Sequence, residues 1–273
     1  GVLLLAVCEL GESKRRIMPW MCLQLCDFTE EDIASHLTQL EEHKDTLSAV
    51  AFEHYHLGPN SELLIFDNVT VVNPQIQRMG LEAWAMISSF PYPDDFIDWM
   101  RQVFATPDPF FAQCIKEGVT NNYTGFNVDW EPAVGATEAD SVAYANFLTE
   151  MTTALAPHGL QVSVDAATWT PLWNYTLLSE SAVNKVITMA TYVGTPKGFL
   201  SNLNQAVDEV GTEKLGVGLQ TINPNTGDLL PLPEVAWRVK KIIEEGVTEI
   251  DIWDCPVPSE WWPILEFFAH GDE

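Results

Sequence analysis

Two carboxylates two residues apart end an otherwise apolar segment, Tyr123-Thr-Gly-Phe-Asn-Val-Asp-Trp-Glu131. On a strand, residues i and i+2 project to the same face, so Asn127, Asp129 and Glu131 would line one side. Desolvation and like-charge repulsion both raise the pKa of carboxyl groups held together beside apolar walls. A general acid that works near neutral pH requires such a raised pKa. The pattern therefore predicts acid–base chemistry; the alternative is a solvated strand end with two ordinary acids.

The elements that would position these acids are eight short apolar or β-branched segments separated by stretches of helical pattern. They are expected at about residues 17–25, 47–54, 80–88, 123–131, 160–167, 185–192, 214–220 and 248–254. The spacing leaves room for a crossover helix after each strand. Eight such units predict an α/β fold, a single (β/α)8 TIM barrel domain over residues 1–273. A doubly wound open sheet is the alternative.

The helical stretches carry start and stop signals. Thr137 precedes a helix that ends near Gly159, and Pro233 lies in the first turn of another helix, which Gly246 ends. A last helix near residues 258–268 would cap the end of the barrel. The irregular section at about 55–79 is expected to be a loop with some strand of its own.

In a barrel of this kind the active site gathers at the C-terminal ends of the strands, where Asp129 and Glu131 fall. Other segment ends supply candidate partners for them. These are Asp165 and Trp169 after the fifth segment, Tyr192 after the sixth, Gln220 after the seventh and Trp253 after the eighth. Aromatic rings pack against the C–H faces of sugars, while polar groups bind hydroxyls and amides. The set of residues is typical of a carbohydrate site.

Composition excludes several other kinds of partner. The net charge of −26 argues against nucleic acid, whose binding depends on Lys and Arg. It also argues against docking on anionic membrane surfaces, and no apolar run is long enough to insert into a bilayer. A neutral sugar is compatible with this charge. Hydrophobic residues make up 47% of the chain, enough for a sizeable core.

Three Asn-x-Thr sequons, at Asn68, Asn122 and Asn174, favour a glycoprotein of the secretory pathway, extracellular or lysosomal. Residues 1–15 are either the remnant of a signal peptide or an N-terminal edge segment. Cys22 and Cys26 lack a second ligand pair at zinc-site spacing, so we expect no metal and no cofactor. The pairing of the five cysteines and the oligomeric state stay open.

Residues 124–131 resemble the fourth-strand signature Asp-x-x-Asp-x-Asp-x-Glu of glycoside hydrolase family 18, the chitinase-like (β/α)8 enzymes. The register places Thr124, Asn127, Asp129 and Glu131 at its four positions. The last two carboxylates match, whereas the first two positions depart from the signature. Asn at the second position looks like the di-N-acetylchitobiase branch, which is lysosomal.

Later segments extend the resemblance, and the first half of the chain shows it poorly. Gln161-Val-Ser-Val-Asp-Ala-Ala-Thr-Trp-Thr-Pro171 is also similar to the chitobiase branch. Met189-Ala-Thr-Tyr192 resembles the sixth-strand Met-x-Tyr with one residue of slippage, and Ile250-Asp-Ile-Trp253 resembles the eighth-strand segment with its sugar-site Trp. The third segment, Trp84-Ala-Met-Ile-Ser-Ser89, lacks the Ser-x-Gly-Gly of the family.

The resemblance implies a role for each matched residue. Glu131 would protonate the glycosidic oxygen, and Asp129 would orient the 2-acetamido group of the substrate for attack on the anomeric carbon. Tyr192 would hold the acetamido carbonyl, and Trp253 would form the base of the sugar site. Because the substrate supplies its own nucleophile, the expected outcome is retention at the anomeric carbon. The implied substrates are β-1,4-linked N-acetylglucosamine units, in chitin oligosaccharides or in the N-glycan core.

The departures from the signature keep other functions open. Asn127 can only hydrogen-bond, and Thr124 removes the outermost carboxylate, so we expect a simplified proton relay. A loss of activity is not obligatory, because the acid Glu131 remains. One alternative is a catalytically weak or silent chitinase-like lectin that binds glycans containing N-acetylglucosamine. Another is a structural protein built on an inactive barrel.

Overall fold

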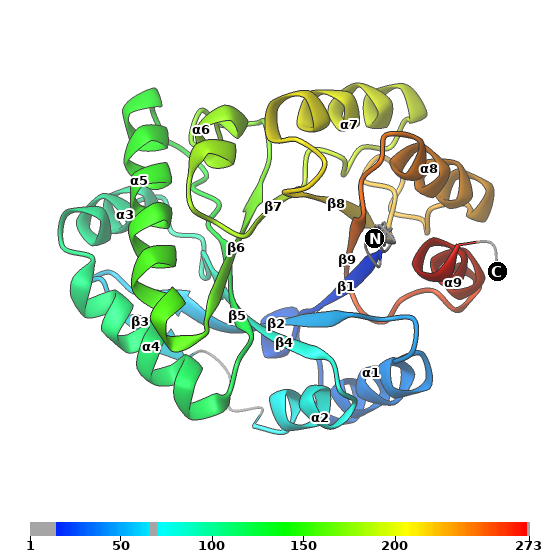
Figure 1. The fold of residues 1–273 in the computed structure, drawn as a ribbon, viewed down its shortest axis with the longest axis horizontal. Helices are drawn as coiled ribbons and strands as arrows, with labels where there is room; N and C mark the ends of the chain where they lie inside the picture. The colour runs from blue at the N-terminus through cyan, green and yellow to red at the C-terminus, as the bar shows by residue number, and fades with distance from the viewer. Residues whose placement is uncertain (1–14, 66–69, 272–273) are drawn as a thin grey trace, which may run out of the picture.

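A closed barrel of parallel strands forms the centre of the molecule (Figure 1). The computed structural model describes residues 15–65 and 70–271. The parallel strands are β1 (Arg16–Met21), β2 (Ala49–Leu57), β4 (Glu82–Ser88), β5 (Gly125–Asp129), β6 (Gln161–Ala166), β7 (Lys185–Thr188), β8 (Leu215–Gln220) and β9 (Glu249–Trp253). Each strand pairs with its neighbour around the ring, and the pairing of β1 with β2 closes it. The predicted (β/α)8 TIM barrel is confirmed.

Helices surround the barrel and cover its outer face (Figure 1). They are α1 (Glu30–Glu42), α2 (Val72–Arg78), α3 (Phe96–Ala105), α4 (Asp108–Asn121), α5 (Glu138–Leu155), α6 (Tyr175–Glu180), α7 (Pro196–Val210), α8 (Leu232–Glu244) and α9 (Trp262–His270). Short 3-10 helices lie at Gln24–Cys26, Ala156–His158 and Ser259–Trp261. Helix α9 stands in this outer ring beside β1 and β9, so the expectation that it caps the end of the barrel was wrong. None of the helices in the described part of the chain is long and apolar enough to cross a membrane.

The structure moves two of the predicted strand ends. The first strand stops at Met21, because Cys22 and Cys26 form a disulfide around a 3-10 turn. The sixth predicted strand stops at Thr188, so Tyr192 lies in the following turn. The extra strand expected in the irregular section is β3 (Leu63–Ile65), which pairs antiparallel with β2 at the edge.

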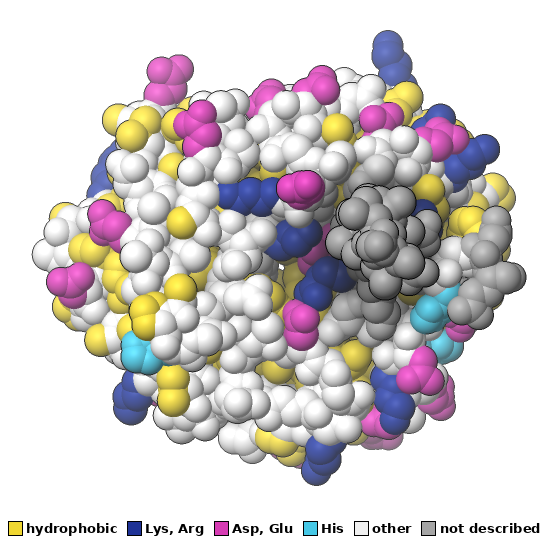
Figure 2. Space-filling view, in the orientation of Figure 1, with side chains coloured by type: hydrophobic (Ala, Val, Ile, Leu, Met, Phe, Trp, Pro, Cys, Tyr) yellow, Lys and Arg dark blue, Asp and Glu magenta, His cyan; other side chains and the backbone are white. Residues whose placement is uncertain are grey.

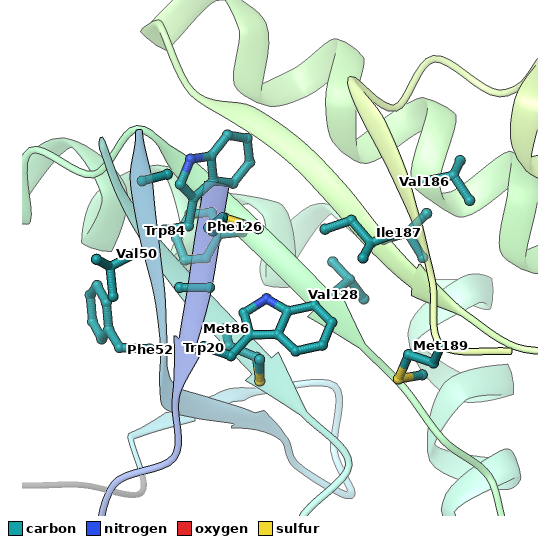
Figure 3. Packing of buried hydrophobic residues seen from close by; sticks show 14 of the residues in the cluster. Trp20, Val50, Phe52, Trp84, Met86, Phe126, Val128, Val186, Ile187 and Met189 are labelled. Carbon is teal, nitrogen blue, oxygen red and sulfur yellow. The ribbon is translucent and has the colours of Figure 1, made fainter. Parts of the chain in front are cut away.

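Alternation along the strands creates an apolar layer outside the barrel and a more polar one inside it. Trp130, just beyond β5, is fully buried and packs against Tyr144 and Phe147 of α5. Figure 3 shows further buried apolar side chains of neighbouring strands, among them Trp20, Trp84, Phe126 and Val128. Because the strand side chains alternate, the residues on either side of Trp130 in the chain are directed toward the barrel axis.

Ion pairs fill the barrel at the N-terminal ends of its strands. Arg16 donates to Glu82 at 2.9 and 2.7 Å and lies 3.4 Å from Glu249. Lys185 reaches the same Glu249 at 2.9 Å. On the face shown in Figure 2, acidic and basic side chains gather around the middle. The charged layer closes one end of the barrel, opposite to the end at which Asp129 and Glu131 lie.

Helix α5 begins as predicted at Thr137, and Asp140 supports this start. Asp140 accepts hydrogen bonds from the Thr137 backbone at 2.8 Å and from Arg101 of α3 at 2.8 and 2.9 Å. The Arg101 guanidinium holds the pKa of the Asp140 carboxyl well below its usual range. The ion pair therefore ties two neighbouring helices together beside the site.

We expect Asp140→Asn to lower the free energy of unfolding by about 2 kcal/mol at neutral pH, as hydrogen bonds to charged groups typically contribute. Because the pKa is lowered in the folded state, this stability is present above the unfolded pKa and is lost as pH falls. Urea unfolding at neutral and acid pH should show the difference between variant and wild type shrinking with acidification. Asp98→Asn, which removes the more exposed partner of Arg101, should cost less. An equal cost for both variants at all pH values would contradict the assignment.

Candidate active site

Strand β5 delivers two of the predicted side chains to the inside of the barrel. Phe126, Val128 and Trp130 are fully buried on the helix side. Asn127 and Asp129 alternate with them and are therefore directed toward the axis, as predicted. Glu131 follows two residues after the strand and is half-buried.

Ser89, at the end of β4, fixes the backbone between the two acids. Its hydroxyl donates to the Asp129 carbonyl at 3.1 Å and accepts from the Glu131 amide at 2.5 Å. The side chain of Ser89 is fully buried, so water does not compete for these bonds. Sequence reasoning missed this residue, although Ser88-Ser89 ends the segment in which the Ser-x-Gly-Gly pattern is absent.

The environment of Asp129 and Glu131 favours the protonated form of both. Asp129 is 7% exposed, and its Oδ1 has no hydrogen-bond partner among the described residues. Burial raises the pKa of Asp129 well above its usual value, and the charges of Glu131 and Asp165 add to this. Burial also raises the pKa of Glu131. Two such carboxyl groups compete for one proton, so one of them can serve as an acid while the other is ionised.

Asn127 holds the polar side chains that lie deeper in the barrel than the acid pair. Its Nδ2 donates to Asp165 Oδ1 at 2.9 Å and to Ser163 Oγ at 3.0 Å. Burial raises the pKa of Asp165 well above its usual value, while the hydrogen bond from Asn127 acts in the opposite direction. The uncharged amide thus holds Asp165 in place beneath the acid pair.

Thr124, the other departure from the family signature, lies away from this cluster. Its hydroxyl accepts a hydrogen bond from the Ala83 amide at 3.1 Å, where β4 and β5 begin. The position is therefore at the end of the barrel opposite to Glu131. Threonine has a structural contact there.

Aromatic rings border the acids. Trp20 of β1 lies edge-on to Trp253 at 6.0 Å and to Tyr192 at 6.5 Å between ring centroids. The Tyr192 hydroxyl is without a hydrogen-bond partner in the described part of the chain. Burial raises its pKa, and the charge of Asp165 is the largest of the nearby acidic contributions. Trp20 was not anticipated, although its place near the end of the first predicted strand offered a signal.

Tyr92 and Glu53 also face this cluster and were missed. Burial raises the pKa of the Tyr92 hydroxyl, and the charges of Asp129, Glu53 and Glu131 raise it further. The residue as a whole is 45% exposed. Glu53 is buried within β2, and an acid amid the apolar residues of a predicted strand was the available signal.

The remaining predicted sugar-binding residues lie farther out. Gln220 ends β8 beside Trp253, and its Oε1 has no partner among the residues described here. Trp169 is 58% exposed and packs edge-on against Trp173 with ring centroids 5.1 Å apart. Trp169 would be available to a ligand at the surface, whereas Gln220 Oε1 and Asp165 are buried.

The predicted glycosylation sites that the structure describes lie at the surface. Asn122 and Asn174 are exposed at helix ends, whereas Asn68 and residues 1–14 lie outside the described residues. Cys114 and Cys255 are buried thiols. Within the described ranges no group of His, Cys, Asp and Glu has the arrangement of a metal site.

The arrangement as a whole is suited to acid catalysis on a neutral ligand. A half-buried acid and a second carboxyl come from the end of β5, a tyrosine hydroxyl follows β7, and an indole ring ends β9, so three strand ends of one barrel contribute. Unpartnered polar atoms among buried groups indicate hydrogen-bonding capacity that a ligand could use.

Comparison with known proteins supports the fold. No family model and no curated protein matches the chain. A chitinase from Chromobacterium violaceum superposes with a TM-score of 0.75 at 12% identity, covering 94% of this chain and 100% of that one. The spore cortex-lytic enzyme SleL of Bacillus megaterium gives 0.75 at 14% identity, covering 93% and 74%. A mutant second catalytic domain of an Ostrinia furnacalis Group II chitinase, solved in complex with (NAG)5, gives 0.76 at 9% identity, covering 96% and 98%.

Proposed function

We propose that the protein is a retaining glycoside hydrolase that cleaves β-1,4 bonds between N-acetylglucosamine units by substrate-assisted catalysis. The observation that carries the proposal is the pair Asp129 and Glu131 at the C-terminal end of β5, where burial raises both pKa values and each competes with the other for a proton. The likeness of the barrel to solved chitinases supports it.

Glu131 is the general acid. It is the more exposed of the two carboxyl groups, so it is the one that a ligand outside the barrel reaches first. Its raised pKa keeps a proton available near neutral pH, which it gives to the glycosidic oxygen as the bond to the anomeric carbon breaks.

Asp129 and Tyr192 act on the 2-acetamido group. Asp129 and Glu131 share one proton, and when it is on Glu131 the Asp129 carboxylate accepts a hydrogen bond from the acetamido N–H. The Tyr192 hydroxyl donates to the acetamido carbonyl. As the glycosidic bond breaks, the carbonyl oxygen attacks the anomeric carbon and forms a cyclic intermediate. Water opens this intermediate with retention of configuration, and the Glu131 carboxylate takes the proton of the water. A nucleophile from the protein is not required, which agrees with the spacing of two residues between the acids.

Trp253 and Trp20 provide the apolar surface against which the sugar ring packs, because C–H faces of sugars match aromatic rings. Asn127 and Asp165 supply charge and hydrogen bonds from below, while Gln220 and Trp169 extend the contact outward. Chitin oligosaccharides and the N-glycan core both contain the required linkage. The sequons at Asn122 and Asn174 support a glycoprotein of the secretory pathway, extracellular or lysosomal, and Asn127 supports the di-N-acetylchitobiase branch.

A single assay of the wild-type protein tests the proposal. We expect release of chromophore from a chromogenic chitobioside and, by NMR on N-acetylglucosamine oligomers, the β-anomer as the first product. A cellobioside, which lacks the acetamido group, should be cleaved far more slowly. Binding of the oligomers without any release over hours would favour the lectin. An α-anomer as the first product would exclude the retaining mechanism.

A further inference from the structure

Asp251 is a buried acid that has no role in the proposed mechanism. It lies on β9, is 0% exposed, and neither carboxyl oxygen has a hydrogen-bond partner among the described residues. An ionised carboxylate in such a place loses its hydration without compensation. The Asp251 carboxyl is therefore expected either to be protonated or to have a partner that hydrogen-bonds to its oxygens.

Two glycines of β8 create the space that Asp251 and Tyr192 occupy. A Cβ at Gly216 would lie 2.4 Å from Asp251 Oδ2. A Cβ at Gly218 would lie 2.8 Å from Tyr192 Cε1 and 3.1 Å from its hydroxyl oxygen. Consecutive inward positions of one strand are about 6–7 Å apart. The carboxyl and the phenol thus contact adjacent inward positions of the same strand, and among the described residues neither has a hydrogen-bond partner.

The charges around Asp251 favour its neutral form. Glu249 of the same strand forms ion pairs with Lys185 at 2.9 Å and with Arg16 at 3.4 Å. Arg16 is further committed to Glu82. The ionisable groups that face Asp251 are Glu249 on β9, Arg16 on β1, Lys185 on β7, Asp165 on β6 and Tyr192 after β7. Burial, followed by the charges of Glu249 and Asp165, raises the pKa of Asp251 well above its usual value, while the charges of Lys185 and Arg16 act in the opposite direction.

We propose that Asp251 is a positioning residue: it stays a neutral acid and donates a hydrogen bond to one bridging water, which in turn donates to the phenol oxygen of Tyr192. A phenol oxygen that accepts from below directs its own O–H away from the barrel interior. In the mechanism proposed above, on which this consequence rests, that O–H meets the acetamido carbonyl. The hydrogen bond itself does not depend on the activity.

The first test uses stability alone and the isosteric variant Asp251→Asn. A neutral acid keeps its proton in the folded state, whereas the unfolded chain releases it above a pKa of about 4. Wild-type stability is therefore lost as pH rises from the unfolded pKa toward the folded one, and an amide removes this loss. The ratio of unfolding constants, wild type over Asp251→Asn, should increase about tenfold per pH unit between about pH 5 and 7. Urea titrations that give a constant ratio would overturn the proposal.

The second test measures the link to Tyr192. Asp251→Leu removes the donor at similar size, and Tyr192→Phe removes the acceptor. Each should lower kcat/KM on a chitobioside by roughly tenfold, and the double variant should lose no more than the worse single one, as for groups that act as a unit. Asp251→Asn should recover most of the activity that Asp251→Leu loses, because an amide N–H also donates. Asp208→Asn, exposed on α7, is the matched control and should equal wild type.

The two tests fail in distinguishable ways. Additive losses for Asp251→Leu and Tyr192→Phe would refute the link, even if the protein hydrolyses chitobiosides. An inactive wild-type protein would refute the proposed function. The link would then be judged by the same double-mutant cycle measured in urea, where coupling between the two positions supports it and additivity refutes it.

Discussion

Glu131→Gln is expected to reduce kcat for hydrolysis of a chitobioside by roughly 10³-fold while largely preserving binding of the sugar. General acids typically contribute about 10²–10⁴-fold to the rate, and an amide of the same shape cannot release a proton to the glycosidic oxygen. Initial rates and direct titration with N-acetylglucosamine oligomers give the two quantities separately.

The identity of the leaving group sharpens this expectation. A substrate whose leaving group is a weak base needs little protonation, so Glu131→Gln should lose much less activity on it than on the oligomers. Glu150→Gln, on the exposed face of α5, is a matched control that should behave as wild type. Loss of binding in Glu131→Gln, or an equal loss on good and poor leaving groups, would assign Glu131 to structure rather than to acid catalysis.

The pH dependence has a defined direction. Because burial raises the pKa of Glu131, the protonated acid persists above the pH at which an exposed glutamate ionises. The alkaline limb of kcat/KM should therefore lie above the usual glutamate pKa, since activity is lost only when Glu131 releases its proton.

The barrel itself could be predicted because its signal is repeated. Eight apolar segments at crossover spacing indicate (β/α)8 closure even when single boundaries are uncertain. The boundaries failed where local interactions override the pattern. The disulfide between Cys22 and Cys26 turns the chain after β1, and a tight turn after Thr188, with Tyr192 N bound to Met189 O, ends β7 early.

The site was predictable where its residues share one strand, and less so where they meet only in space. Asp129 and Glu131 could be predicted because the alternation of polar and apolar residues within one segment places them on the same face. Trp20 and Tyr92, by contrast, join the cluster through contacts between residues far apart in the chain, which no local period encodes. Buried acids inside apolar strands were the overlooked signal, because such positions are costly unless the fold uses them. Asp251 is the clearest case.

Asp129→Asn should lower activity and raise stability, whereas most substitutions in a core lower stability. We expect kcat on N-acetylglucosamine oligomers to fall by about 10²-fold, because an amide no longer stabilises the charge that develops on the acetamido nitrogen.

The same change should stabilise the protein at neutral pH. The pKa of Asp129 is raised by burial, so the folded state loses stability as pH rises through the range between the unfolded and folded pKa values, and asparagine has no proton to release. Urea unfolding should show the gain in the free energy of unfolding growing from acid toward neutral pH.

Substrates that lack the acetamido group test the role of Asp129 in catalysis. Their slow cleavage does not use Asp129, so Asp129→Asn should change it little. An equal fractional loss on these substrates would mean that Asp129 acts on Glu131 alone. A variant that is both inactive and destabilised at neutral pH would mean that the carboxylate is ionised and paired in the folded state, so that charge strain beneath the site, the feature on which the proposed function depends, does not exist.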